Sequence, residues 1–211
     1  MSVMMREAHE KIVRKLKKRS RILNSIFVFL FLFSVLFYWV GNIRNDLIRE
    51  SYQVVRQHLM DRQSRYILLE ILRNKPLSIG QALEVADVVV EESRASRVPI
   101  HIALGVMSLE SEFYPYAVSS MGARGLMQIM PEKWKEYVSS PDLQGQASRH
   151  NPALNVRVGI RYLGDLCKEY GNWKKVLKEY GGFVKADPGP YTRIVMANAE
   201  KFRVQLGEKA L

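Results

Sequence analysis

One run of this sequence is apolar on every face of a helix. Residues 22–40 read I-L-N-S-I-F-V-F-L-F-L-F-S-V-L-F-Y-W-V and contain no charged side chain. As an α-helix the run would be about 28 Å long, close to the roughly 30 Å thickness of a bilayer's hydrocarbon core. Tyr38 and Trp39 at its far end are typical of the membrane interface. A helix that is apolar on every face is either buried in a protein core or spans a membrane. The length and the unbroken apolarity of this run favour the membrane span.

The charges beside this run predict its orientation. Residues 1–21 hold eight Lys or Arg against two Glu, a net charge of +6, and the remaining residues carry +5 of the total +11. Positive charge before the span predicts a cytoplasmic N-terminus, with the rest facing outward. The alternative, a cleaved signal peptide, has an apolar region of about 7 to 15 residues that ends at small residues. This run is longer and ends Y-W-V-G-N-I-R.

The position of the positive charge also bears on the binding partner. A basic segment next to an apolar span favours membrane lipids, whereas nucleic acid is not expected because the sequence has no recognised motif for it. Residues 41–75 carry an apolar helical pattern with a row of arginines, which predicts a helical stalk. The pattern is equally compatible with a helix that packs on the next domain or self-associates. The predicted regions are a basic cytoplasmic segment (1–21), a transmembrane anchor (22–40), a helical stalk (41–75) and a helical domain (76–211).

Residues 76–211 show helical patterns and no strand-like alternation of useful length, so we expect a compact, mainly α domain. Ser78 and Gln81 have the spacing of a capping box. Asn155 is a plausible cap of a later helix. Residues 139–151 are expected to form a loop. Further helices are expected to begin at Pro131, Asn172 and Pro190.

A carboxylate continues the apolar stripe of one expected helix. Apolar residues recur at helical spacing from Ile100 to Met107, after Pro99, and Glu110 follows on the same face. Glu112 turns roughly 200° away, so we expect Glu110 to face the apolar interior and Glu112 to face water. Partial burial raises the pKa of a carboxyl, which can then donate a proton near neutral pH. The alternative is a solvated acid at a helix end.

The stretch after this acid carries many residues at fixed spacing. The pattern E-S-x-F-x-P-x-A-x-S-x-x-G-A-x-G-L-M-Q-x-M-P runs from Glu110 to Pro131. It resembles the signature of soluble-lytic-transglycosylase-like domains, relatives of goose-type lysozyme. An Asn leading into G-x-x-Y-L, here Gly159 to Leu163, is similar to the same family. The resemblance covers residues 76–205 and implies a lysozyme-like fold. Because Gly costs about 1 kcal/mol in a helix, we expect a neighbouring helix to approach Gly159 closely.

The resemblance implies a reaction. The family cleaves the β-1,4 bond between N-acetylmuramic acid and N-acetylglucosamine in peptidoglycan, and the muramyl 6-hydroxyl attacks its own anomeric carbon to leave a 1,6-anhydro end. Glu110 would be the acid that gives and takes back the proton. One carboxylate then suffices, whereas ordinary glycosidases use two. Other acids, outside the family motifs, are Asp142, Asp165, Glu179 and Asp187. Neither a metal nor another cofactor is expected.

The resemblance also implies side chains that touch the sugar. Ser111 would position the acid or contact sugar, and Gln128 would donate an amide hydrogen bond; packing and backbone bonding are the alternatives. Tyr180 and Tyr191 would place phenols near the reacting sugar, unless they are core residues. Gly181 stands where the family usually has Asn. The predicted substrate-binding residues are Ser111, Met127, Gln128, Tyr180 and Tyr191.

Three functions fit these patterns. The leading prediction is a lytic transglycosylase anchored in the bacterial inner membrane, with a periplasmic catalytic domain that acts on peptidoglycan strands. The second is a muramidase that uses water, and the third is a catalytically weak wall-binding scaffold in an envelope-spanning protein machine. His101 and His150 lack metal-ligand spacing and are predicted to be structural. Cys167 is the only cysteine, so no intrachain disulfide can form.

Overall fold

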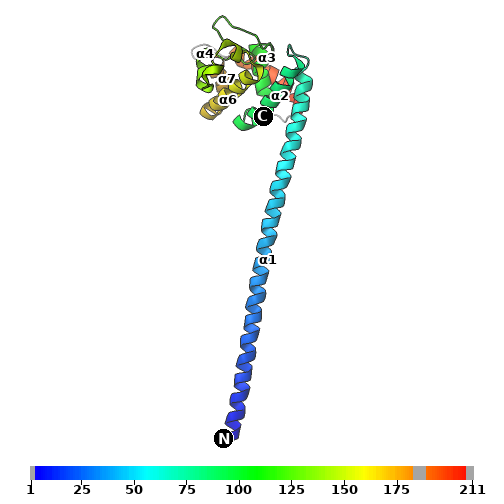
Figure 1. Cartoon of the computed structure of the whole chain (residues 1–211), viewed down its shortest axis with the longest axis vertical. Coiled ribbons are helices and arrows are strands. Elements are labelled where there is room, and N and C mark those ends of the chain that lie inside the picture. The colour runs from blue at the N-terminus through cyan, green and yellow to red at the C-terminus, as the bar shows by residue number, and fades with distance from the viewer. Residues whose placement is uncertain (1–2, 183–188, 208–211) are drawn as a thin grey trace. The chain divides into compact units, whose positions relative to one another are not determined.

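The computed structural model describes residues 3–182 and 189–207, and every regular element in these ranges is a helix. The chain separates into two units, Met1–His58 and Leu59–Leu211. The first helix, α1 (Val3–Leu72), begins in the first unit and ends in the second. The second unit holds the other labelled helices of Figure 1. The predicted mainly α fold is confirmed.

In the first unit, α1 carries the apolar run on an exposed surface. Phe27 and Phe37, for example, are 73 % and 74 % exposed. Among the described residues, α1 is the one helix long and apolar enough to cross a membrane, judged by length and composition. A signal sequence near an N-terminus meets the same two criteria.

In the second unit, the last turns of α1 form part of the core. Leu68 and Leu72 are fully buried, and both belong to the core cluster of this unit. The segment from Leu59 onward therefore packs on the helical domain. For this part of residues 41–75, the structure shows packing on the domain, a possibility that the sequence left open.

The centre of the second unit is α3 (Ile100–Glu110), which is buried over most of its length and follows Pro99 as expected. Helix α8 (Gly189–Leu206) packs against it. The close approach requires Gly105, because a Cβ there would lie 2.7 Å from the Val195 carbonyl oxygen.

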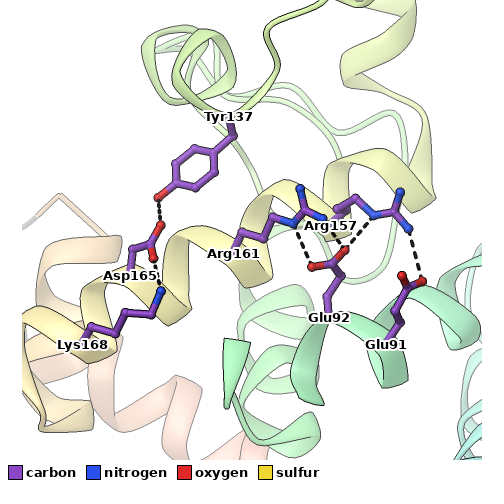
Figure 2. A network of polar contacts seen from close by, with 7 residues as sticks. All are labelled: Glu91, Glu92, Tyr137, Arg157, Arg161, Asp165 and Lys168. Atoms are coloured by element: carbon purple, nitrogen blue, oxygen red, sulfur yellow. Dashed lines mark hydrogen bonds and ion pairs between the residues drawn. The ribbon is translucent and has the colours of Figure 1, made fainter. Parts of the chain in front are cut away.

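Helices α2 (Ile79–Ser96) and α6 (Pro152–Tyr170) are joined by a buried carboxylate (Figure 2). The side chain of Glu92 is only 3 % exposed. Arg161 donates to both of its oxygens, at 2.8 and 2.9 Å, and Nε of Arg157 lies 2.8 Å from Oε1. Two guanidinium groups thus compensate the buried charge, as a buried carboxylate requires.

Most predicted helix starts are confirmed. Ser78 and Gln81 form the predicted capping box at the start of α2. Helix α4 (Pro131–Tyr137) begins at its proline. The side chain of Asn172 accepts a hydrogen bond from the Lys174 N–H at 2.9 Å, at the start of α7 (Trp173–Tyr180).

Two local predictions are wrong. Residues 139–151 do not form a plain loop, because they contain η1 (Pro141–Leu143) and α5 (Gln146–Arg149). Asn155 does not cap α6. The cap is Asn151, whose side chain accepts a hydrogen bond from the Leu154 N–H at 2.8 Å.

The glycine inside α6 makes room for a side chain rather than for a helix. A Cβ on Gly159 would lie 2.8 Å from Cβ of Met127, which belongs to the loop between α3 and α4. The prediction of a close neighbour at Gly159 is confirmed, but the neighbour belongs to a loop. This contact fixes the loop against α6.

Candidate active site

Glu110 ends α3 and is largely buried, whereas Glu112 is exposed, as the helical stripe predicts. The Tyr191 hydroxyl, on α8, donates a hydrogen bond to Oε1 of Glu110. Burial raises the pKa of Glu110, and the weaker opposing effect of the Tyr191 hydrogen bond lowers it. The net result is a carboxyl whose protonated form is favoured more than that of an exposed glutamate.

The residue after this acid links α3 to the next loop. The Ser111 hydroxyl donates to the Leu126 carbonyl at 2.8 Å, with the Met107 carbonyl also within reach at 3.2 Å. Its backbone N–H bonds the same Met107 carbonyl. Ser111 thus holds the end of α3, and with it Glu110, against the loop that carries Met127 and Gln128.

That loop is held by a buried amide that the sequence reasoning did not assign to the site. Asn155 is fully buried, and its Oδ1 accepts from the Met127 N–H at 2.8 Å. Its Nδ2 donates to the carbonyls of Arg124, at 2.8 Å, and Arg149, at 3.1 Å. One sequence signal could have identified this residue. Asn155 stands among apolar residues in a helical pattern, and a buried amide needs several hydrogen-bond partners.

Gln128 adopts a left-handed backbone conformation, with φ of 48°. Its Nε2 donates to the carbonyls of Ala117, at 3.1 Å, and Gly125, at 3.0 Å. Both amide hydrogens therefore serve the loop itself. The predicted donation from Gln128 to a sugar is not available in this arrangement, and Oε1 is the polar atom left to act as an acceptor.

Tyr180 contacts the loop that carries Met127 and Gln128. Its hydroxyl donates to the Met127 carbonyl at 2.8 Å, and its ring centroid lies 5.2 Å from that of Tyr162. Burial, and after it the negative charge of Glu110, raises the pKa of Tyr180. The same two causes, in the same order, raise the pKa of Tyr191. Both phenols are therefore neutral hydrogen-bond donors close to Glu110.

A groove of about 270 Å³ opens beside these residues. Its lining includes Gln128 and Tyr180. Glu110 is not a lining residue, but it is close enough to Tyr180 for its charge to raise the pKa of that phenol. The ammonium of Lys133 lies 4.8 Å from the centre of the Tyr162 ring. The lining residues are Gln128, Ile129, Met130, Glu132, Lys133, Tyr162, Glu179, Tyr180 and Gly182.

The other candidate acids are placed differently. Asp142 lies in η1 and is exposed. Asp165 accepts hydrogen bonds from Tyr137 and Lys168, at 2.8 and 2.7 Å (Figure 2), and Glu179 lines the groove. Asp187 falls outside the described residues. Within those residues, no second carboxylate contributes to the pKa shift of Glu110.

The predicted structural role of His150 agrees with its contacts. Its Nδ1 lies 3.1 Å from the Pro115 carbonyl and its Nε2 lies 3.0 Å from Nη1 of Arg124. A carbonyl can only accept and a guanidinium can only donate, so Nδ1 is the donor and Nε2 the acceptor in these contacts. In the part of the chain that the structure describes, no group of three or more His, Cys, Asp or Glu side chains could hold a metal ion.

Parts of the chain are similar to known proteins. Residues 87–183 match the family model described as "Transglycosylase SLT domain". The chain is 29 % identical over 126 residues to membrane-bound lytic murein transglycosylase C of Mannheimia succiniciproducens, which covers 50 % of this chain and 35 % of the relative. It is 40 % identical over 73 residues to the protein of that name from Haemophilus ducreyi, covering 33 % of this chain and 20 % of the relative.

A solved structure shares the fold. The X-ray structure of an inactive mutant of lytic transglycosylase Slt from Pseudomonas aeruginosa superposes with a TM-score of 0.50 and 21 % sequence identity, over 58 % of this chain and 24 % of that one. The resemblance predicted from the motifs is confirmed, as is the lysozyme-like helical fold. The chain spans about a third or less of the length of these curated relatives.

Proposed function

We propose, from the similarity of residues 87–183 to transglycosylase SLT domains, that this chain is a membrane-anchored peptidoglycan lytic transglycosylase. Its substrate would be the β-1,4 bond between N-acetylmuramic acid and N-acetylglucosamine, and its product a 1,6-anhydro-muramyl end. The observation that carries the proposal is the buried Glu110 with its raised pKa, at a position where the family motif has its acid. Burial favours the protonated form of this side chain, which is the form that a general acid needs.

The first step would be proton donation from Glu110 to the glycosidic oxygen. Because the Tyr191 hydroxyl already donates to Oε1, the transferable proton belongs on Oε2. As the bond between the anomeric carbon and the leaving oxygen breaks, that oxygen takes the proton and positive charge develops on the muramyl ring. The carboxylate left behind would be stabilised by the Tyr191 hydrogen bond.

The second step returns the proton. The muramyl 6-hydroxyl oxygen bonds to the anomeric carbon, and its proton passes to Oε2 of Glu110, so the acid is regenerated and no water is consumed. This sequence needs one carboxylate. The absence of a charge effect from a second carboxylate on Glu110, among the described residues, is consistent with it.

The groove would hold the glycan strand. Tyr162 offers an aromatic surface for a sugar ring, and Gln128 would accept a hydrogen bond through Oε1 because its amide hydrogens are engaged. Met127 would act through its backbone, whose carbonyl accepts the Tyr180 hydroxyl. Ser111 would position Glu110 through the Leu126 carbonyl.

The apolar run of α1 would anchor the chain in the bacterial inner membrane. The curated relatives are named membrane-bound, and the apolar run fits a single span. The basic residues before it favour a cytoplasmic N-terminus and a periplasmic catalytic domain. We keep the predicted division into residues 1–21, 22–40, 41–75 and 76–211, with the part of 41–75 from Leu59 onward packed on the domain. The proposed partners are membrane lipids and an envelope-spanning protein machine.

The decisive experiment is the mass of the fragments that the full chain, in detergent, releases from isolated sacculi. We expect muramyl products lighter by one water than hydrolysis products. Glu110→Gln should lower the release rate by about 10²- to 10⁴-fold, with an unchanged melting temperature or a higher one. Glu112→Gln is the matched control, because Glu112 is exposed two residues away, and it should retain activity.

Two results would contradict the proposal. Products heavier by one water would identify a muramidase that uses water. Binding of the intact chain to sacculi with no release of fragments would favour a wall-binding scaffold.

A further inference from the structure

Helix α1 carries two exposed apolar stripes just after the apolar run. The first consists of Ile48, Tyr52 and Val55, and the second of Ile43, Leu47 and Val54. All six side chains are exposed, by 42 to 71 %. At about 100° per residue, the centres of the two stripes lie about 130° apart around the helix axis. Exposed apolar stripes on a helix are typical of a surface that packs on another helix.

Opposite charges flank the two stripes. Arg49 and Arg56 lie beside the first stripe, and Asp46 and Glu50 lie beside the second, at the helix positions that border an apolar seam. Asp46 and Arg49 of one helix are 4.0 Å apart, and both are more than three-quarters exposed. A pair this exposed is weak, so both side chains are available to charges on another molecule.

The charges distinguish two ways of pairing parallel copies. If the first stripes of two copies met, Arg44 of each would face Arg49 of the other, and the like charges would repel. If the first stripe met the second stripe of the next copy, Arg49 would lie on the same side of the seam as Asp46 and Glu50 of that copy, while Arg44 of both copies would lie on the other side. The first arrangement therefore sets only like charges against each other, whereas the second adds an attractive set, Arg49 with Asp46 and Glu50.

The positions of the side chains along the helix axis also agree with this second arrangement. Two helices that leave one membrane side by side are parallel and in register. Ile48 then lies level with Leu47 of the next copy, and Val55 with Val54.

We propose that the part of α1 next to the membrane docks a second copy of this chain, with the first stripe of one copy packed on the second stripe of the next. Such head-to-tail contacts leave one stripe free on each terminal copy, so assembly continues beyond two copies until a ring closes. The proposal rests on the proposed membrane anchor, which keeps the copies parallel, and is independent of the proposed catalytic chemistry.

Disulfide cross-linking of the full chain in neutral phosphatidylcholine vesicles tests this arrangement. Each variant is made in a Cys167→Ser background, and two differently tagged populations are reconstituted together. We expect Ile48→Cys in one population to cross-link efficiently with Leu47→Cys in the other, whereas Ile48→Cys alone should cross-link poorly with itself. Gln53→Cys mixed with Gln57→Cys, on the remaining face of the helix, measures random collision.

Charge exchange tests the same contact independently. Arg49→Glu in the Ile48→Cys population should lower the yield several-fold, and Glu50→Arg in the Leu47→Cys population should restore it. Efficient Ile48→Cys self-cross-linking would overturn the proposal in favour of a symmetric dimer. A mixed yield equal to that of the Gln53/Gln57 control would overturn it in favour of a different partner. Sacculus cleavage is measured separately, so a failure here is distinct from a failure of the proposed function.

Discussion

Among single side chains, Tyr191 has the most direct effect on the proposed acid. It donates to Oε1 of Glu110 and therefore stabilises the charged form. Burial acts in the opposite direction and is the larger effect. The pKa of Glu110 therefore depends on its burial and on a hydrogen bond from Tyr191, which lies 81 residues further along the sequence.

Removing that hydroxyl should move the pH profile upward. Tyr191→Phe deletes the effect that lowers the pKa of Glu110, so the acid stays protonated to higher pH and the alkaline limb of the rate profile shifts to higher pH. The rate at the optimum should fall by about 10- to 100-fold, because the carboxylate formed in the first step loses its donor. The measurement is fragment release from sacculi as a function of pH. Tyr116→Phe, on an exposed tyrosine, is the control, and an unshifted limb in Tyr191→Phe would contradict the assignment.

The sequence predicted some of these residues better than others. Glu110 could be predicted because a helical stripe and a motif coincide on it. Asn155 was misassigned as a cap, because local spacing cannot reveal that Asn151 lies at the helix start or that Asn155 faces a loop 28 residues earlier. Local spacing also could not reveal that the amide hydrogens of Gln128 bond carbonyls of its own loop, and its contact with sugar stays a prediction.

Among the helices, α6 positions the loop of the site through a glycine. Gly159→Ala should improve intrinsic helix propensity by about 1 kcal/mol and yet destabilise the fold, because the new Cβ would press on Met127. We expect a net loss of about 1–3 kcal/mol in urea denaturation, together with lower activity. Gly80→Ala in α2 is the control, because its Cβ would meet open space. Equal stabilisation by both substitutions would contradict the packing role.

The contact between α2 and α6 depends on one buried carboxylate (Figure 2). Glu92→Ala should cost about 1–3 kcal/mol, because Arg157 and Arg161 would lose a charged hydrogen-bond partner, although both are exposed enough to be solvated, by 36 % and 49 %. Glu91→Ala, on a side chain that is 57 % exposed, should cost less than about 1 kcal/mol. Urea denaturation of the full chain in detergent compares the two. Similar losses of unfolding free energy in the two variants would contradict the special importance of the buried carboxylate.

For the whole molecule, the unequal spread of charge predicts its topology. In a Cys167→Ser background, Ser51→Cys should react with a membrane-impermeant thiol reagent in intact spheroplasts, whereas Ser20→Cys should react only after lysis. The physical reason is the net charge of +6 before the apolar run. The reverse labelling pattern would contradict the proposed orientation. Loss of residues 1–40 from the purified chain would instead identify a cleaved signal sequence.

The way α3 and α8 meet has a consequence for when the chain can act. Glu110 lies near the middle of the chain, but the phenol that bonds it belongs to the last described helix, and Gly105 admits that helix only in close fit. A nascent chain that has emerged only as far as Glu110 therefore lacks this contact. On the proposed function, full activity would have to await translation of α8, which carries Tyr191, 81 residues after the acid.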